Sequence, residues 1–444
     1  MIKFSQIASP LLLLLPMTAV PAAIAQAIPA ASASPISTGF ALPSIAGTLQ
    51  YAVCASQSYS SNSFGSSSTS SFSNLSGDLA FITGNLNPFS TTFSGGRSWS
   101  SSGQSSSYYF LNLSLNQIIH AKRWTFVVSD SVNYLPQTAS TGFSGVPGVG
   151  DLGVNPAQTG ANPVPVAGAN PGQGVLSGFS TRVANSSSLS LERELTGKTS
   201  LQASGSYSLT RFLDNSGPNP GLDSDSESGS LNLNHRIDAR NSASGNFAYS
   251  RSTFSGDNYG IPQPGFSSQT ASMQYTHQFS RKLVVDLSAG PQWTSINTPG
   301  GTPSLSLFAN LSATYSGEFS RASLAYTRSS NSGFGVVGGA ISDSVSFTAS
   351  RTFDRVWLCA LSTAYTQTAN LPAAGSLPFT FHTTVTGVQV SRAIARSFSA
   401  YASYTLEDQS NRGTGAAVDL YSGISNVAGF GLTYSPSSIR LGHS

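Results

Sequence analysis

The stretch LERELTGKTSLQASGSYSL, residues 191–209, decides the class of fold. A compact group of charged side chains opens it. From Leu201 to Leu209, apolar or small residues then alternate with polar ones. Alternation with a period of two indicates a β-strand with one apolar face and one polar face. The stretch therefore predicts the end of one strand, a solvent-exposed turn and the start of the next strand.

The same alternation recurs along nearly the whole chain. Leu231 and Leu233, for example, alternate with Asn232 and Asn234. Helical spacing is not convincing anywhere. We expect eighteen strands, with sixteen as the alternative count. They are 47–59, 72–82, 87–97, 104–117, 122–135, 183–194, 198–212, 227–237, 241–252, 268–279, 282–292, 304–317, 320–329, 341–352, 355–367, 380–393, 396–406 and 423–435.

Two classes of connection alternate between these strands. Short, charged turns are expected at 120–124, 192–198, 235–240, 279–282, 318–321, 351–355 and 392–396. Long loops rich in Gly, Pro, Asn and Asp are expected at 136–182, 213–227, 253–268, 292–303, 329–340, 368–379 and 407–422. A secreted β-sandwich would not sort its connections in this way, and a β-helix would show a fixed repeat. The pattern predicts an all-β fold, a single transmembrane antiparallel up-and-down β-barrel with short periplasmic turns and long extracellular loops.

The distribution of charge supports this topology. Only 9% of the 444 residues are charged, against about 25% in a typical soluble protein. Most of the 21 basic residues fall at the short turns, and half of the 18 acidic residues fall in the long loops. Trp124 and Trp357 each follow a short turn, where an interfacial aromatic girdle is expected. The opposite girdle is expected at Tyr207, Tyr249, Tyr326, Tyr365 and Tyr404.

Three further expectations concern the ends of the chain and single residues. Residues 1–27 have the pattern of a secretory signal peptide, 28–45 form a periplasmic linker, and 46–444 form the barrel. Cys54 and Cys359 either form one disulfide or are two small buried or lipid-facing residues. Gly387 interrupts the alternation of its strand and predicts a β-bulge.

The chain resembles porin-like bacterial outer-membrane β-barrel proteins over about residues 47–435. Its last strand carries Phe430, Leu432 and Tyr434 on one phase. In such families a C-terminal strand of this kind, ending in an aromatic residue, is the signal to the barrel assembly machinery. Here ten residues follow Tyr434, which departs from that pattern. The resemblance implies the outer membrane as location, with its lipid and lipopolysaccharide as partners, and leaves open whether barrels form homo-oligomers.

The polar phase of the strands predicts the lining of a lumen. Barrels of 16–18 strands leave an aqueous channel. The basic members of this set either face solutes or bind turn carbonyls and lipid headgroups at the rim. The candidate pore-lining residues are Lys198, Arg236, Arg240, Lys282, Arg321, Asn232, Asn234, Asn246, Gln274 and Asn310. By the same resemblance, loop 136–182, whose one charged residue besides Arg182 is Asp151, either constricts the lumen or stays at the surface.

The leading functional hypothesis is a porin-like channel for passive diffusion of small hydrophilic solutes. The alternatives are a structural or adhesive barrel with surface-exposed loops and a blocked lumen, and a transporter of apolar compounds. No hydrolase, metalloprotease or nucleotide-binding motif occurs, so we expect neither an enzyme nor a cofactor. The basic residues are dispersed around a rim, which gives no support to nucleic-acid binding. The acidic run 222–228 is expected to be a solvated loop, with a divalent cation bridging lipopolysaccharide as the alternative.

Overall fold

The computed structural model describes residues 47–61, 69–83, 87–100, 107–136, 181–213, 222–255, 257–258, 261–262, 264–297, 303–331, 339–354, 356–371, 379–413 and 422–441. The predicted signal peptide, the linker and nearly all of loop 136–182 lie outside these ranges. The expectations that concern them, including the role of Asp151, stay predictions. The described residues contain no helix long and apolar enough to cross a membrane.

Strands account for almost all of the described chain, as alternation with a period of two predicts. They are β1 (Gly47–Ser61), β2 (Thr69–Thr83), β3 (Phe89–Ser100), β4 (Tyr108–Ala121), β5 (Trp124–Pro136), β6 (Thr181–Thr196), β7 (Thr199–Phe212), β8 (Asp223–Arg236), β9 (Asn241–Ser255), β10 (Asp257–Asn258), β11 (Ile261–Pro262), β12 (Phe266–Ser280), β13 (Leu283–Ile296), β14 (Ser304–Ser316), β15 (Ser320–Asn331), β16 (Ala340–Phe353), β17 (Trp357–Asn370), β18 (Phe379–Ala395), β19 (Phe398–Gly413), β20 (Gly423–Tyr434) and β21 (Ile439–Leu441).

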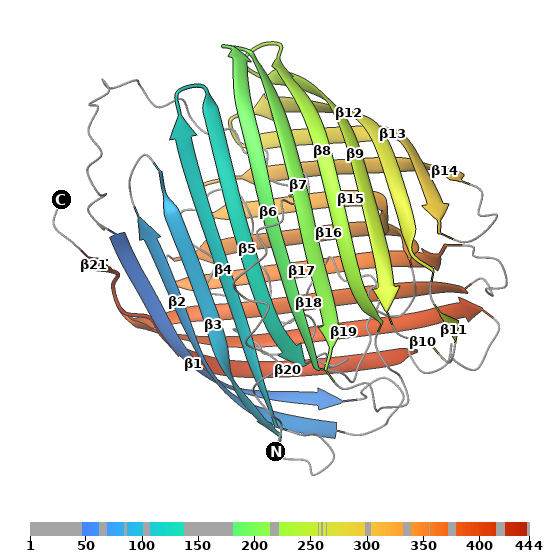
Figure 1. The fold of residues 1–444 in the computed structure, drawn as a ribbon. Coiled ribbons are helices and arrows are strands. Elements are labelled where there is room, and N and C mark those ends of the chain that lie inside the picture. The colour runs from blue at the N-terminus through green and yellow to red at the C-terminus, as the bar shows by residue number, and fades with distance from the viewer. Residues whose placement is uncertain are drawn as a thin grey trace, which may run out of the picture.

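The long strands close into one antiparallel barrel (Figure 1). Each pairs with the next along the chain, the small hairpin β10–β11 is skipped, and β20 returns to pair with β1. The sheet has nineteen strands, of which β21 is a three-residue addition, so eighteen strands form the wall. The expectation of an eighteen-stranded up-and-down barrel is confirmed.

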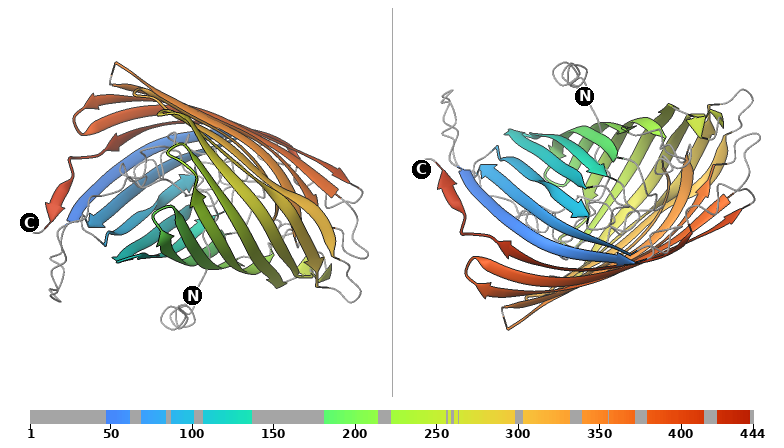
Figure 2. Two further views of the ribbon diagram at one scale, coloured as in Figure 1. Left: turned by 90° about the horizontal axis from the view of Figure 1, so that it is seen from above. Right: turned by 90° about the horizontal axis from the view of Figure 1, so that it is seen from below.

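The two walls of the barrel cross steeply. In Figure 1 the strands β4–β9 of the near wall run at a large angle to β15–β20 of the far wall, and in Figure 2 the ring is flattened when it is seen from either end. Strands of a closed barrel tilt by about 35–45° from its axis, so opposite walls cross at roughly twice that angle. The crossing follows from closure and does not indicate a second domain.

Connections of the two predicted classes lie at opposite ends of the barrel. We call them the turn end, with connections such as 122–123 and 197–198, and the loop end. Three strands have a register shift just before a two-residue turn, between Glu194 and Thr196, between Gln278 and Ser280, and between Ala393 and Ala395. The residues inserted there, Leu195, Phe279 and Ile394, expose large apolar side chains.

The prediction of a bulge at Gly387 is wrong. Gly387 pairs in regular register with Ser362 on β17 and with Thr405 on β19. The irregularity of β18 lies near its turn, at Ala393 and Ala395. A glycine within a strand leaves the hydrogen-bonded ladder unbroken where both neighbouring strands are in register with it. A bulge increases the local twist of a strand, and β18 has its extra residue, Ile394, beside its tight turn.

The seam between β20 and β1 is completed by the residues that follow Tyr434. Tyr434 itself pairs with Val53, halfway along β1. The chain then passes through 435–438, and β21 pairs with Gly47–Leu49, the first three residues of β1. The ten residues beyond Tyr434, which depart from the pattern of the resembling family, therefore contain the strand that finishes closure at the turn end.

A close approach on the inner wall explains one glycine at this seam. A Cβ atom at Gly431 would lie 2.6 Å from the ring of Tyr401. The Tyr401 ring occupies the space that a side chain at position 431 would fill, and its hydroxyl lies 3.8 Å from the Cys54 sulfur on β1. Cys54 and Cys359 lie on β1 and β17 and are not joined in a disulfide, so the alternative of two separate small residues is correct.

Candidate functional site: the two faces of the barrel wall

The outer face of the barrel is apolar over its middle. Leu231, Leu233 and Phe247 are each about half exposed, and Met273 is 76% exposed. Their sequence neighbours on the opposite phase, such as Asn232, point to the inner face, because side chains alternate across a strand. A contiguous band of exposed large apolar side chains is what a membrane-spanning barrel presents to lipid.

An aromatic girdle lies at the turn end of this outer face, as predicted. Trp124 and Trp357 are 36% and 38% exposed. An arginine from the neighbouring strand packs over each indole, Arg193 over Trp124 and Arg392 over Trp357, both at 5.0 Å from the ring centroid. Such stacking keeps the guanidinium at the water boundary while its stem covers apolar surface.

Tyrosines form the second girdle at the loop end. Tyr249, the fifth predicted member, is 41% exposed on the outer face. The hydroxyls of the other four are hydrogen-bonded to a residue of the next strand, so they are held in place where the apolar band ends. The pairs are Tyr207 with Asp225 (2.9 Å), Tyr326 with Asp343 (2.9 Å), Tyr365 with His382 (2.8 Å) and Tyr404 with Asn426 (2.6 Å). Ten residues separate Trp124 from Tyr134 on β5, which spans about 25 Å for a strand tilted by about 40°.

Two of these tyrosines, Tyr207 and Tyr326, each belong to a separate cluster of three residues that was not predicted from the sequence. Arg211 binds Asp225 through two contacts of 2.7 and 2.8 Å, and the same carboxylate accepts the Tyr207 hydroxyl. Arg328 and Asp343 repeat the arrangement with Tyr326. The partners come from strands joined by a long loop, so only the register of β7 with β8 and of β15 with β16 brings them together.

The sequence led us to expect a solvated loop at the acidic run 222–228, and this expectation is wrong. Most of the run is the start of β8. Its acids alternate with serines, and Asp225 and Glu227 therefore share the outer face with Arg211. Charge is tolerated there because the site lies at the loop end, where a charged side chain costs far less than at the middle of a membrane. Within the described residues, no group of three acidic, histidine or cysteine side chains is arranged to hold a metal ion.

One outer-face carboxylate lies inside the apolar band. Asp130 is six residues beyond Trp124 on β5 and four before Tyr134, on the same phase as both. Asn185 donates to its carboxylate at 3.1 Å and Ser187 at 2.7 Å. The sequence pattern placed nearly every charge at a rim, and Asp130 is an exception that these two cross-strand donors stabilise.

The inner face is lined by hydroxyl and amide groups. Serines and threonines of adjacent strands bond to one another along it, as in Ser204 with Ser230 (2.7 Å) and Ser344 with Thr366 (3.0 Å). Asn232 and Asn246 face each other in register on β8 and β9. Their side-chain oxygens have no protein partner. Both of these oxygens are buried, so they are not exposed to the lumen in this structure.

The predicted pore-lining residues fall into two groups. Asn232, Asn234, Asn246, Gln274 and Asn310 lie within strands on the inner phase. The basic residues lie at the turn end: Lys198 and Lys282 are turn residues, Arg240 is in the bend after β8, and Arg236 and Arg321 are at strand ends. Lys198 donates to the carbonyl oxygen of Ile237 at 3.5 Å, and Arg236 donates to that of Gly197 at 3.2 Å.

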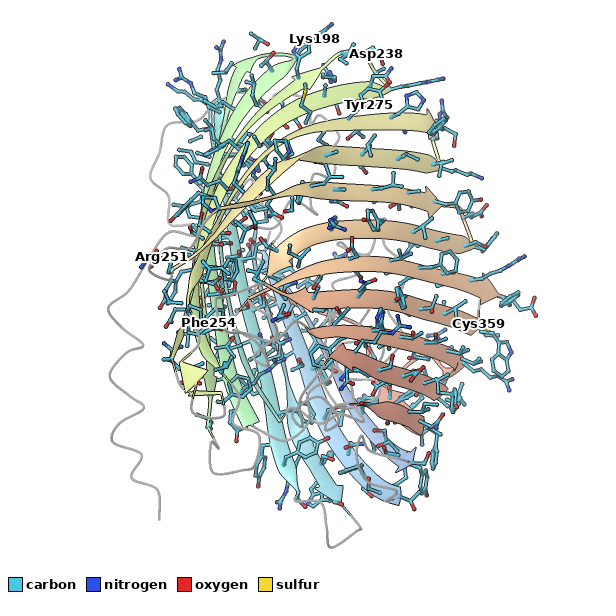
Figure 3. All side chains as sticks on the ribbon, turned by 90° about the vertical axis from the view of Figure 1, so that its right-hand side faces the viewer. Lys198, Asp238, Arg251, Phe254, Tyr275 and Cys359 are labelled. Carbon is cyan, nitrogen blue, oxygen red and sulfur yellow. The ribbon has the colours of Figure 1, made fainter. Side chains whose placement is uncertain are left out.

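These two contacts agree with the alternative that the cations bind turn carbonyls at the rim. Figure 3 shows Lys198 and Asp238 together at the turn end, with Arg251 toward the opposite end. Asp238 accepts the backbone N–H of Arg240 and two donors of Asn241. These bonds, that of Arg240 first, hold the pKa of the Asp238 carboxyl below its ordinary value. Asp238 thus anchors its turn.

Acidic side chains also lie on the inner face, among them Asp286, Asp78 and Glu407, which no sequence pattern groups together. Asp286 on β13 accepts hydrogen bonds from Thr276 at 2.5 Å and Ser312 at 3.3 Å. Asp78 on β2 and Glu407 on β19 are 4% and 1% exposed. Burial differs around the inner face. Most inner-face side chains of β17–β20, β1 and β2 are buried, whereas most of those of β7–β9 are partly exposed.

A closed eighteen-stranded wall with an apolar, girdled outer face and a polar inner face defines a transmembrane β-barrel. No family model matches the chain, and no curated protein matches it. Solved structures with a similar course include Pseudomonas aeruginosa OpdL, at 12% identity and a TM-score of 0.43 over 89% of this chain and 99% of that chain. Another is the outer membrane protein opdK of the same organism, at 9% identity and a TM-score of 0.40 over 88% and 99%. A third is Pseudomonas aeruginosa OccK2 (OpdF) in complex with glucuronate, at 9% and 0.43 over 88% and 98%.

Proposed function

We propose that the protein is a channel of the bacterial outer membrane through which small hydrophilic solutes diffuse passively. The carrying observation is the contrast between the faces of one closed wall, apolar outside and lined by hydroxyl and amide groups inside. Barrels of this strand number leave an aqueous lumen that side chains do not fill. An inner face whose hydrogen-bonding groups are mostly uncharged hydroxyls and amides suits neutral polar solutes better than strongly charged ones.

The orientation follows from the two ends of the barrel. The turn end faces the periplasm in this proposal, because short turns lie there in bacterial barrels, and the loop end faces the outside. Lys198, Arg236 and Arg321 would then ring the periplasmic mouth. Since two of them are bound to turn carbonyls, we expect only a weak preference for anions.

The test is the conductance of the full-length, folded protein in planar lipid bilayers. An ohmic current in potassium chloride supports the channel, and its absence from inserted protein overturns it. A variant lacking 150–175 separates the two roles of loop 136–182. Raised conductance supports a constriction, and unchanged conductance assigns the loop to the surface.

The second candidate is a structural barrel with a blocked lumen. It is favoured by one observation, the deep burial of inner-face polar side chains on one side of the wall. Ser58, Thr368, Thr383, Gln409 and Ser425 are all at most 1% exposed. A folded barrel that inserts but passes neither ions nor small sugars, in bilayers and in liposome swelling, would support this candidate.

A further inference from the structure

Arg97 occupies an unusual place on the outer face. It lies on β3, opposite Leu75 of β2 and Tyr109 of β4. Its guanidinium packs over two aromatic rings, 5.3 Å from the centroid of Trp99 and 4.9 Å from that of Tyr109. Both rings are exposed at the loop end of the apolar band, Tyr109 by 58%. The two aromatic rings stabilise the cation, but they do not neutralise its charge.

No carboxylate is available to neutralise Arg97 on this part of the wall. From β1 through β4 the sequence contains one acidic residue, Asp78, and that side chain is buried on the inner face. The contrast with two other loop-end arginines is direct, because Arg211 and Arg328 each bind an aspartate at 2.7–2.8 Å. The Nε atom of Arg97 is buried without a hydrogen-bond acceptor in the described chain, and so is that of Arg328, so the difference between the two arginines is the aspartate that Arg328 binds.

Small polar side chains lie beside Arg97 on the same face. Gln57 donates to Ser71 at 2.5 Å and accepts from Ser73 at 2.6 Å. Ser73 pairs with Trp99, so it is one register step from Arg97 toward the loop end. The amide of Gln57 and the hydroxyls of Ser71 and Ser73 therefore lie near the positive charge of Arg97, at the boundary of the apolar band.

We propose that Arg97, with Trp99, Tyr109, Gln57, Ser71 and Ser73, binds the phosphate of a phosphorylated lipid headgroup in the outer leaflet. A planar guanidinium offers parallel N–H donors to a phosphate, and it tolerates aromatic stacking on its faces. The amide and hydroxyls of β1 and β2 are placed to take further phosphate or sugar oxygens. The ligand class is a phosphorylated glycolipid such as the lipid A part of lipopolysaccharide, because the loop end, where the site lies, faces outward in the orientation proposed above.

The experiment measures retention of lipid by the full-length protein in detergent micelles, by native mass spectrometry. The probes are diphosphoryl lipid A, the same lipid after removal of both phosphates, and phosphatidylglycerol. The variants are Arg97→Gln, Arg97→Lys and, as the matched control, Arg328→Gln, whose arginine already binds Asp343. Heat-modifiable migration on a gel confirms that each variant is folded.

We expect wild-type protein to retain diphosphoryl lipid A about tenfold more strongly than the dephosphorylated lipid. Arg97→Gln should abolish the difference, Arg97→Lys should keep part of it, and Arg328→Gln should change it by less than twofold. Equal retention of the two lipid A forms by wild type overturns the site. So does an unchanged preference in Arg97→Gln, and equal retention of phosphatidylglycerol overturns the assignment to the glycolipid. If Arg97→Gln does not fold, the wild-type comparison and Arg97→Lys decide.

Discussion

Replacing Leu231 with arginine tests which face of β8 meets lipid. Leu231 is 50% exposed on the outer face, four residues from His235 at the turn end and four from Glu227 at the loop end. An arginine on the lipid face at mid-membrane costs about 2–4 kcal/mol. That cost lowers the folding equilibrium constant by roughly 30- to 700-fold. The Leu231→Arg barrel should therefore unfold at a measurably lower concentration of denaturant than the wild-type barrel.

The neighbouring substitution Asn232→Arg is the matched control, because it places the same charge on the inner face of the same strand. It should cost less than about 1 kcal/mol, since an arginine there reaches an aqueous lumen. Both variants are unfolded by guanidinium in lipid vesicles, with tryptophan fluorescence and heat-modifiable gel migration as readouts. A larger loss for Asn232→Arg than for Leu231→Arg would show that the faces are assigned the wrong way round.

Three other changes probe particular contacts. Gly431→Ala should cost about 1–3 kcal/mol of unfolding free energy, because its Cβ meets the Tyr401 ring, and Tyr401→Ala should remove most of that cost in the double variant. Asp343→Asn should cost about 0.5–1 kcal/mol, since the ion pair with Arg328 is about one-third exposed; a double-mutant cycle without coupling would contradict this. Asp238 should titrate below its ordinary pKa of 3.8 by NMR in micelles, because donors of its own turn stabilise the carboxylate. That stabilisation is present above the unfolded-state pKa and is lost as pH falls through the lower folded value.

The strands could be predicted because each carries its own signal. The two faces of β7, for example, are written in the alternation of Leu201 to Leu209, and the strand needs no knowledge of its neighbours to be recognised. The turns could be predicted for the same local reason, since charged residues mark the water boundary in a chain that is otherwise almost uncharged. Strand number then followed from counting, and up-and-down pairing followed from the alternation of connection lengths.

The clusters could not be predicted because they depend on register across a long loop. Asp225 meets Arg211 only when β7 and β8 pair with Leu209 opposite Asp225, and nothing in either segment fixes that pairing by itself. The polar contacts of Asp130 depend in the same way on β6, which is separated from β5 by the longest loop. The prediction of a bulge at Gly387 was wrong because it relied on the local break in alternation alone. The neighbouring strands β17 and β19 keep the hydrogen-bonded ladder regular at this residue.

The choice between lysine and arginine on this barrel follows the physical difference between their cations. The lysines of the described chain, Lys122, Lys198 and Lys282, all lie in turns, where the compact ammonium stays hydrated. The outer face instead carries arginines, most of them against an aspartate or an aromatic ring. These pairs are Arg97 with Trp99 and Tyr109, Arg193 with Trp124, Arg211 with Asp225, Arg328 with Asp343, Arg351 with Phe353, and Arg392 with Trp357. Because a guanidinium is weakly hydrated and can stack, it tolerates the edge of a membrane at lower cost than an ammonium. At the loop end, Arg97 stacks on two aromatic rings but binds no carboxylate, whereas Arg211 and Arg328 each bind an aspartate. We therefore infer that the membrane itself supplies the anion that neutralises the charge of Arg97.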